Sequence, residues 1–184
     1  MAALPAALVP ALSVPLSTAS ALPPLRAWRI DAAEHAATWH SGIGAERFGG
    51  RWNPRGLRAV YASLDPATCL VEAAVHRGFD VLDTRPHVLS CLQIDPLPDG
   101  QPGVQVVAPA DLPNPAWLHG GTPGAGQQRF GAGWLASPGV LVIASAVSRH
   151  SWNLVFSPDV AGARVRLLQQ QRLVIDTRLN PAAA

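Results

Sequence analysis

Lysine is missing from this chain of 184 residues, in which all 14 basic residues are arginines. A Schiff-base mechanism needs a lysine amine, and a P-loop ends in a Gly-Lys-Ser or Gly-Lys-Thr segment, so both are excluded. Any bound anion must therefore be held by arginine, histidine or backbone N–H groups. The 18 prolines and 16 glycines indicate a GC-rich coding sequence, which explains most of the arginine bias.

Acidic residues are also few, with three glutamates, Glu34, Glu46 and Glu72, beside nine aspartates. The net charge of +2 excludes strong binding of polyanions by bulk electrostatics. Hydrophobic residues make up 48% of the chain and include six tryptophans, enough for a sizeable core. We therefore expect a globular protein rather than a disordered one.

Cysteine is nearly absent, because Cys69 and Cys91 are the only two. They form no disulfide framework and fit no zinc-ligand spacing, and the six histidines show no HExxH motif. A metal pair of Glu72 and His76 lacks a third ligand at a convincing spacing. We expect no metal, and a reducing cytoplasm is the simplest compartment.

Residues 1–24 differ in composition from the rest of the chain. They are rich in alanine and proline and carry no charged side chain, whereas a signal peptide needs a positive n-region. Five prolines in this segment would interrupt a membrane-spanning helix. We interpret it as an unstructured or loosely packed extension, with an export signal as the alternative, and residues 25–184 as one domain.

The local patterns predict an α+β fold. We expect strands at residues 26–30, 58–63, 87–95, 140–145, 153–156, 164–169 and 172–176, and short helices at 112–117 and 125–136. A further helix at 68–77 follows an Asp65 N-cap and Pro66, and Gly78 ends it. Residues 40–54 carry four glycines and are expected to form a loop. Strand spacing is too irregular for a doubly wound sheet, and a Rossmann fingerprint is absent.

Glu72 is the most unusual residue, because it lies in the middle of the apolar helical segment CLVEAAV. Carboxylates are rarely buried unless they are paired or functional. The alternative is that Glu72 lies on a solvent-facing stripe with His76, four residues later.

Two arginines are candidates for binding an anion. Arg51 follows two glycines in GGRWN, which allow a ligand close to the backbone, and a guanidinium can hold phosphate through two hydrogen bonds. Arg29 lies in a short strand, AWRI. The alternative for Arg51 is a surface turn with the side chain in solvent. The alternative for Arg29 is a strand residue that faces solvent.

Tyr61 and Ser145 are weaker candidates. The chain's one tyrosine lies in an apolar strand, where it either packs in the core or offers a face on which a flat ring such as nicotinamide stacks. Ser145 ends the strand VLVIAS, but no GxSxG motif surrounds it, so it is not expected to be a hydrolase nucleophile.

The order of these residues resembles the RES domain, the toxin half of RES–Xre type II toxin–antitoxin systems, named for an Arg, a Glu and a Ser. The matching segments are SGIGAERFGGRWNPRGLRAVYAS, DPATCLVEAAVH, LPNPAW, VLVIASAVSRHSWNLVFSP and IDTRL, over about residues 25–180. The departures are IAS in place of the more usual Pro-Ser, and Ser157 where asparagine is common.

This resemblance implies an ADP-ribosyltransferase-like fold, a mixed split β-sheet with flanking helices around a cleft for NAD⁺. It implies that NAD⁺ is the substrate and that its nicotinamide–ribose bond is cleaved. The implied partner is an Xre-type helix-turn-helix antitoxin that blocks the cleft and represses the operon. DNA is then contacted only through the antitoxin, and no membrane is involved. Whether the protein forms a homodimer within the complex is left open by the resemblance.

The resemblance also assigns roles to residues. It implies that Glu72 stabilises an oxocarbenium-like state, that Arg29 and Arg51 grip the pyrophosphate or ribose, and that Tyr61 stacks on nicotinamide. Ser145 would bind substrate or orient Glu72. Trp52 and Asn153 are expected in the NAD⁺-binding wall.

The acceptor of ADP-ribose stays open between water, phosphate and protein. Leu70, two residues before Glu72, replaces the second acid of arginine-modifying transferases, which favours hydrolysis or phosphorolysis. The alternatives are a protein mono-ADP-ribosyltransferase and a catalytically silent antitoxin-binding module.

Overall fold

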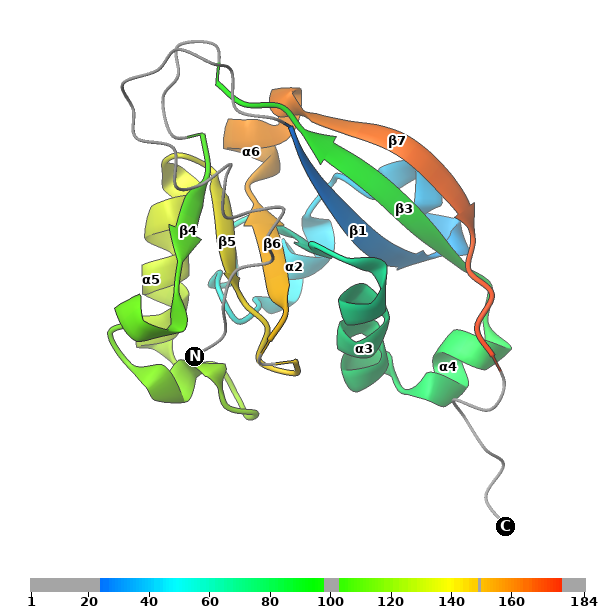
Figure 1. The fold of residues 1–184 in the computed structure, drawn as a ribbon, viewed down its shortest axis with the longest axis horizontal. Coiled ribbons are helices and arrows are strands. Elements are labelled where there is room, and N and C mark those ends of the chain that lie inside the picture. Colours follow the sequence, from blue (N-terminus) through cyan, green and yellow to red (C-terminus); the bar gives the residue numbers. More distant parts are fainter. Residues whose placement is uncertain (1–23, 98–102, 149, 177–184) are drawn as a thin grey trace.

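One mixed β-sheet organises the backbone. The computed structural model describes residues 24–97, 103–148 and 150–176, and within them seven strands pair in the order β4-β5-β6-β2-β1-β3-β7 (Figure 1). The strands are β1 Leu25–Ala32, β2 Val60–Ser63, β3 His87–Ile94, β4 Gln105–Val107, β5 Val140–Ala144, β6 Trp152–Phe156 and β7 Val165–Arg172. β4 and β5 run parallel, and the other neighbours run antiparallel.

The sheet nearly divides between β1 and β2. β1 pairs with β3 at eight positions, but its register with β2 holds a single pair, Trp28 and Ser63. The two strands therefore diverge and separate a β4-β5-β6-β2 half from a β1-β3-β7 half (Figure 1). This arrangement confirms the predicted α+β fold with a split mixed sheet.

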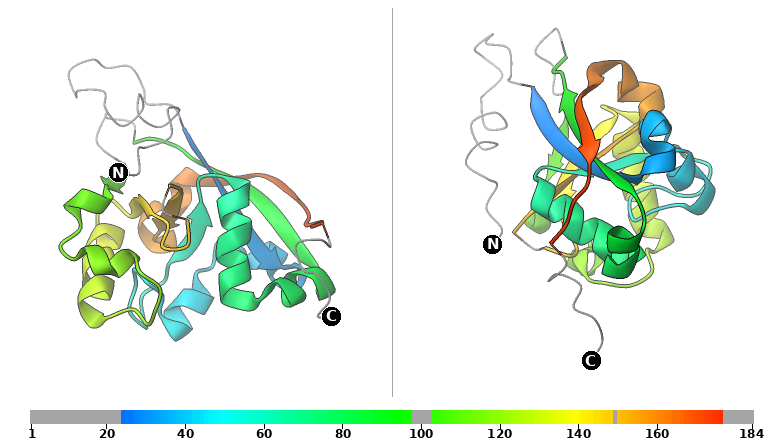
Figure 2. Two further views of the ribbon diagram at one scale, coloured as in Figure 1. Left: turned by 60° about the horizontal axis from the view of Figure 1, so that its bottom comes forward. Right: turned by 90° about the vertical axis from the view of Figure 1, so that its right-hand side faces the viewer.

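The helix α3, Pro66–Arg77, lies across the divergence of the two halves (Figure 2). It begins as predicted, because the Asp65 carboxylate accepts a hydrogen bond from the Thr68 N–H at 2.8 Å and Pro66 needs no N–H partner. It ends at Gly78, whose φ of +87° lies in the region that favours glycine. Local sequence thus fixes the ends of the helix that carries Glu72.

The remaining helices cover the sheet. They are α2 Ile43–Phe48, α4 Phe79–Thr84, α5 Ala125–Ala136 and α6 Pro158–Ala161, with 3₁₀ turns at Ala33–Thr38, Pro109–Asp111, Pro115–Leu118 and Gly162–Arg164. β5 is buried along its whole length: Val142 packs with Trp152 and Phe156, whereas Ile143 packs with Trp52 and Leu135 of α5. Burial on both faces makes β5 the centre of the core.

The prediction of a loop over residues 40–54 was wrong in part, because α2 lies within it. The left-handed φ of +67° at Gly42 turns the chain, and the Glu46 N–H then donates to the Gly42 carbonyl. The glycines on both sides of this short helix hid it in the sequence.

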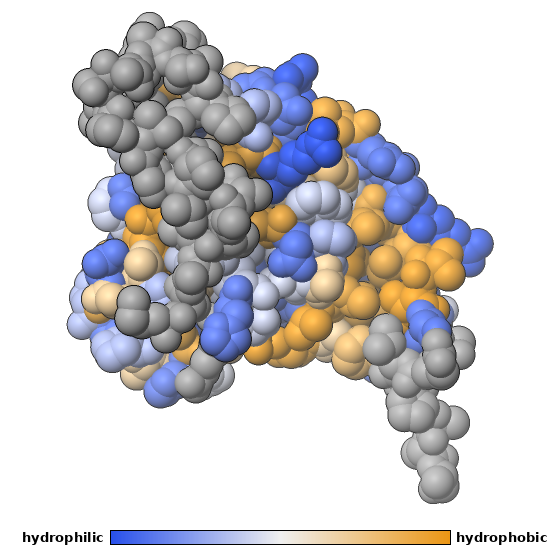
Figure 3. Space-filling view, viewed as in Figure 1, coloured by the Kyte–Doolittle hydropathy of each residue, from blue (hydrophilic) through white to orange (hydrophobic). Residues whose placement is uncertain are grey.

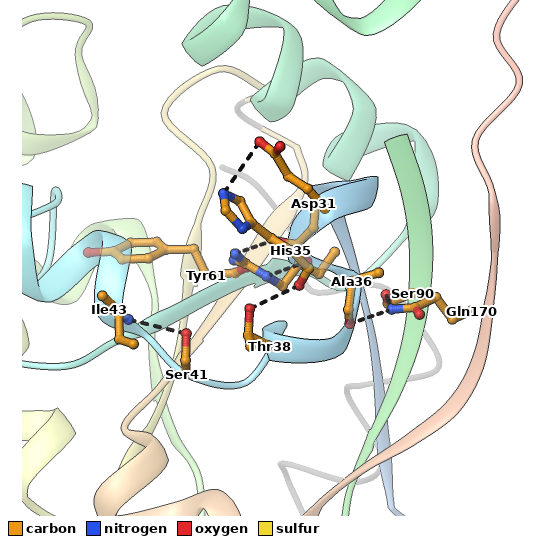
Figure 4. Close-up of polar contacts among 11 residues, drawn as sticks. Asp31, His35, Ala36, Thr38, Ser41, Ile43, Tyr61, Ser90 and Gln170 are labelled. Atoms are coloured by element: carbon orange, nitrogen blue, oxygen red, sulfur yellow. Dashed lines mark hydrogen bonds and ion pairs between the residues drawn. The ribbon is translucent and has the colours of Figure 1, made fainter. Parts of the chain in front are cut away.

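Of the two strands predicted near the C-terminus, the one at 164–169 is confirmed and continues to Arg172 as β7. It pairs with β3 through a β-bulge opposite Cys91 and Leu92, and an edge strand needs a partner on one side only. Gln170 donates to Ser90 Oγ at 2.9 Å and to the Ala36 carbonyl at 3.1 Å, which fastens the 3₁₀ turn to the sheet (Figure 4).

After β7 the chain is irregular instead of forming the predicted strand at 172–176. Leu173 and Ile175 pack against Ile30, Cys69 and Leu82, so hydrophobic burial there does not require a strand. In Figure 3, hydrophobic residues gather on the right-hand half of the molecule, where Figure 1 shows β3 and β7.

Two further sequence predictions need comment. The helix expected at 112–117 is wrong: the 3₁₀ turn Pro115–Leu118 covers only its end, because prolines at positions 113 and 115 interrupt helical hydrogen bonding. Residues 1–23 of the predicted extension lie outside the described residues.

Candidate active site

A cavity of about 390 Å³ opens where β1 and β2 diverge. Its walls come from β1, β2, α3, the ends of β5 and β6, and the segment from α2 into GGRW. Six of the seven predicted site residues line it, namely Arg29, Arg51, Trp52, Tyr61, Glu72 and Asn153. These residues come from distant parts of the chain, and the divergence of the sheet brings them together.

Glu72 projects from α3 into this cavity and is held through one carboxylate oxygen. Its Oε1 accepts hydrogen bonds from Ser145 Oγ at 2.6 Å and from Asn153 Nδ2 at 2.5 Å. The Glu72 side chain is 19% exposed, whereas that of His76 is 76% exposed. Glu72 therefore lies in the cavity wall and not on a solvent stripe shared with His76.

The second oxygen, Oε2, faces a less crowded environment. The exposed imidazole of His76 places its Nε2 3.9 Å from Oε2. One oxygen is thus fixed by the protein, and the other is available to a ligand in the cavity.

Ser145 lies behind Glu72 and is fully buried at the end of β5. Its Oγ accepts hydrogen bonds from the N–H groups of Val147 at 3.1 Å and Ser148 at 2.9 Å. Its single proton goes to Glu72. These hydrogen bonds fix the direction of the Ser145 hydroxyl and, through it, the position of Oε1 of Glu72.

Asn153 extends this network to β2. Its Oδ1 accepts a hydrogen bond from Ser63 Oγ at 2.8 Å, while its Nδ2 donates to Glu72. Ser63 is 2% exposed and was missed by the sequence reasoning. Its place at the end of the strand beside the site was the available signal, but pairing with Asn153 depends on the β2–β6 register.

Tyr61 presents its ring to the cavity and anchors its hydroxyl in the protein. The hydroxyl donates to Asn53 Oδ1 at 2.6 Å and accepts from the Trp52 N–H at 3.0 Å. Burial raises the pKa of Tyr61 well above its ordinary value, so the phenol stays neutral. A Cβ at Gly50 would lie 2.4 Å from this hydroxyl, which explains the second glycine of GGRW.

Asn53 holds the glycine-rich segment in place and was also missed. It is fully buried, and its Nδ2 donates to the carbonyls of Ala45 and Leu57, both at 2.9 Å. It therefore ties α2 to the tyrosine. The motif GGRWN contains this residue, but sequence alone does not separate its role from that of its neighbours.

Arg29 lines the cavity with its charge already paired. Its Nε and Nη2 donate to the two oxygens of Asp31 at 2.9 and 2.6 Å, and Nη1 donates to the Tyr61 carbonyl at 2.8 Å. Asp31 is 4% exposed and was not predicted. Figure 4 shows Asp31 and Tyr61, the two residues that this guanidinium joins. Arg29 thereby links β1 to β2 where their pairing fails.

Arg51 reaches the cavity with a different set of partners. Its Nη1 donates to the carbonyls of Trp117 at 3.0 Å and His119 at 3.2 Å. Buried Gln127 donates to the same Trp117 carbonyl at 2.9 Å. Within the described residues no carboxylate pairs with Arg51, so its positive charge faces the cavity without compensation.

Comparison with known proteins fits this geometry. The model of the RES domain family matches residues 26–176. This chain belongs to the RES family. It is 30% identical over 154 residues to Prs ADP-ribosylating toxin of Sphingobium sp. (strain YBL2), across 78% of this chain and 90% of that protein.

Two further comparisons agree. Toxin Res of Photorhabdus laumondii is 29% identical over 159 residues, across 84% of this chain and 97% of that protein. The crystal structure of the M. tuberculosis MbcT-MbcA toxin-antitoxin complex has the same fold, with a TM-score of 0.66 and 22% identity over 83% of this chain and 85% of that chain. The predicted family is confirmed.

Two further properties of this RES chain concern metal and membrane. Among the residues that the structure describes, no group of three or more histidine, cysteine or acidic side chains could hold a metal ion. No helix in the described ranges is long and apolar enough to cross a bilayer.

Proposed function

We propose that this RES protein is the toxin of a toxin–antitoxin pair and that it breaks the nicotinamide–ribose bond of NAD⁺. The observation that carries the proposal is the Glu72 carboxylate, fixed through Oε1 by Ser145 and Asn153 with Oε2 toward the cavity. Its relatives include proteins named as toxins and as an ADP-ribosylating toxin, which supports NAD⁺ as the substrate.

The chemistry needs one well-placed carboxylate. The C1″–N bond to nicotinamide breaks with its electron pair leaving on nicotinamide, which is already cationic and requires no general acid. Positive charge grows on the ribose, and Glu72 stabilises that charge and holds a ribose hydroxyl through Oε2. Ser145 and Asn153 keep the carboxylate oriented before the substrate arrives, so little reorganisation is required.

The aromatic wall receives the leaving group. Tyr61 offers a neutral ring for stacking, and its hydroxyl is committed to Asn53 and Trp52. Trp52 is 2% exposed and packs edge-on against Trp117 and Phe130, which makes this wall rigid. Nicotinamide would therefore be held by shape, and Arg51 would supply positive charge toward the phosphates.

Water or phosphate is the proposed acceptor. Its oxygen forms the new bond to C1″ and gives up a proton, yielding ADP-ribose or its 1″-phosphate. Leu70 stands where arginine-modifying transferases have a second acid. Transfer to a protein is the second candidate, because a relative is named an ADP-ribosylating toxin.

The proposed partner is an Xre-type helix-turn-helix antitoxin that blocks the cavity, with DNA reached only through that antitoxin. A structural relative is itself a toxin-antitoxin complex. The proposed compartment is the cytoplasm. It holds the NAD⁺ pool, and its reducing conditions suit the free thiols of Cys69 and Cys91.

Product analysis tests the proposal. Purified protein is incubated with NAD⁺ labelled in its adenosine half, with and without phosphate and with cell extract. Free nicotinamide with ADP-ribose or its phosphorylated form supports the proposal, whereas label on protein supports transfer. Glu72→Gln should abolish turnover, and Glu34→Gln, on an exposed side chain, is the matched control. Unchanged NAD⁺ with wild-type protein, the behaviour of a silent binding module, would overturn it.

A further inference from the structure

Three arginines line the cavity, and their charges are not equivalent. Arg29 forms a two-bond ion pair with buried Asp31, which cancels its charge. Arg51 donates only to neutral carbonyls, and the side chain of Arg77 forms no ion pair with another described residue. Two uncompensated positive charges therefore remain at the cavity, on Arg51 and Arg77.

The position of Arg77 suits a group beyond the reacting ribose. It lies five residues after Glu72 in the last turn of α3, about 7.5 Å further along the helix axis. It lines the same cavity as Glu72, and it is exposed, so it can change rotamer without breaking a contact. A ligand whose reacting sugar meets Glu72 would place its next charged group near Arg77.

We infer that Arg77, together with Arg51, binds the diphosphate of the dinucleotide, and that Arg29 instead holds β1 and β2 at the split of the sheet. This inference rests on the proposed function. The diphosphate carries two negative charges, which match the two uncompensated guanidiniums, and an arginine binds phosphate oxygens through parallel hydrogen bonds. The sequence motifs alone pointed to Arg29 and Arg51.

Kinetics with two substrates tests this assignment. NAD⁺ has the diphosphate, whereas nicotinamide riboside has the same scissile bond and no phosphate. We expect Arg77→Gln to raise KM for NAD⁺ by about 10- to 100-fold with kcat nearly unchanged, and to leave turnover of nicotinamide riboside as it is. Arg77→Lys should recover part of the loss. Arg85→Gln, an exposed arginine outside the cavity lining, is the charge-matched control.

Other outcomes have distinct meanings. An unchanged KM for NAD⁺ in Arg77→Gln, or equal losses on both substrates, overturns the inference. A lower Tm with unchanged KM would show that Arg77 only stabilises the C-terminal end of α3.

Calorimetric titration with ADP-ribose, which keeps the diphosphate, separates this inference from the proposed function. If the wild type binds ADP-ribose and Arg77→Gln binds it at least about tenfold more weakly, the inference stands even where NAD⁺ is not cleaved. If the wild type binds no ADP-ribose, the inference fails, whereas the proposed function is still judged by cleavage of NAD⁺ alone.

Discussion

Ser145 donates its only hydroxyl proton to Glu72 across 2.6 Å, although 73 positions separate the two residues in the chain. Ser145 receives two backbone N–H groups of the turn after β5, which fix the direction of its oxygen. The orientation of the carboxylate on α3 is therefore set by the end of the most buried strand.

Ser145→Ala tests this relationship. It removes one donor to Glu72 and leaves the N–H groups of Val147 and Ser148 without their acceptor. We expect kcat to fall by about 10- to 100-fold with little change in KM, and the free energy of unfolding to fall by about 1–3 kcal/mol. Ser148→Ala, in the same turn, should retain kcat. A rise in KM at constant kcat would instead assign Ser145 to substrate binding.

The Tyr61 hydroxyl should titrate far later than an ordinary phenol. Burial is the main cause of its raised pKa, so the folded protein should form no phenolate around pH 10, where an exposed tyrosine is half ionised. Tyr61 is the chain's only tyrosine, so the absorbance at 295 nm reports on it alone.

The same titration in urea provides the comparison, because unfolding should restore the ordinary pKa of the Tyr61 phenol. Phenolate formation near pH 10 in the folded protein would contradict the buried hydrogen bonds to Asn53 and Trp52.

Two glycines of α5 should respond in opposite directions to alanine. A Cβ at Gly131 would lie 2.2 Å from the Trp52 carbonyl oxygen, so Gly131→Ala must push the helix from the cavity wall. We expect a loss of about 1–3 kcal/mol in the free energy of unfolding. At Gly133 nothing lies within 4 Å of the added Cβ, so Gly133→Ala should gain about 0.5–1 kcal/mol from helix propensity.

Urea unfolding of both variants measures these changes. A stabilising effect of Gly131→Ala would show that α5 does not approach Trp52 as closely as the structure has it.

Asp95 should make stability depend on acid pH. The hydrogen bond from Arg166, followed by that from Gln93, lowers the pKa of Asp95 in the folded protein below its ordinary value. The ionised form therefore stabilises the β3–β7 pair above the unfolded pKa of about 3.9. That contribution is lost as the pH falls through the lower folded pKa.

Asp95→Asn removes this dependence. We expect it to be less stable than the wild type at neutral pH and nearly equal to it at about pH 2, where the wild-type carboxyl is protonated as well. Thermal unfolding across this range measures the difference, with Asp83→Asn, at an exposed position of α4, as control. A constant difference between Asp95→Asn and wild type at all pH values would contradict the ion pair with Arg166.

Much of the framework of the site was predictable because it is encoded locally. Asp65, Pro66 and Gly78 fix the ends of α3, and the wholly apolar composition of VLVIA predicts a buried strand. The second glycine of GGRWN is needed because the chain at Gly50 passes close to the Tyr61 hydroxyl. Such features depend on neighbours a few residues away, so they can be inferred from short segments.

The partners of the functional side chains depended on the tertiary structure. Arg29 and Asp31 lie two residues apart, on one face of a strand. Whether the Arg29 guanidinium pairs with Asp31 or stays available to a ligand depends on burial at the split of the sheet. The anchoring of Arg51 by Trp117 and His119 joins segments more than 60 positions apart, and no local pattern indicates it.

The absence of lysine and the scarcity of glutamate determined which residue types could bind an anion or stabilise a cation in this protein. They did not distinguish which arginines have a charge available to an anion, and they did not specify the orientation of Glu72. The tertiary structure decided both, because the divergence of β1 and β2 opens the cavity, buries Asp31 against Arg29, and brings Ser145 and Asn153 to one oxygen of Glu72. Charge pairing and burial arise from long-range packing, which sequence patterns a few residues long do not contain.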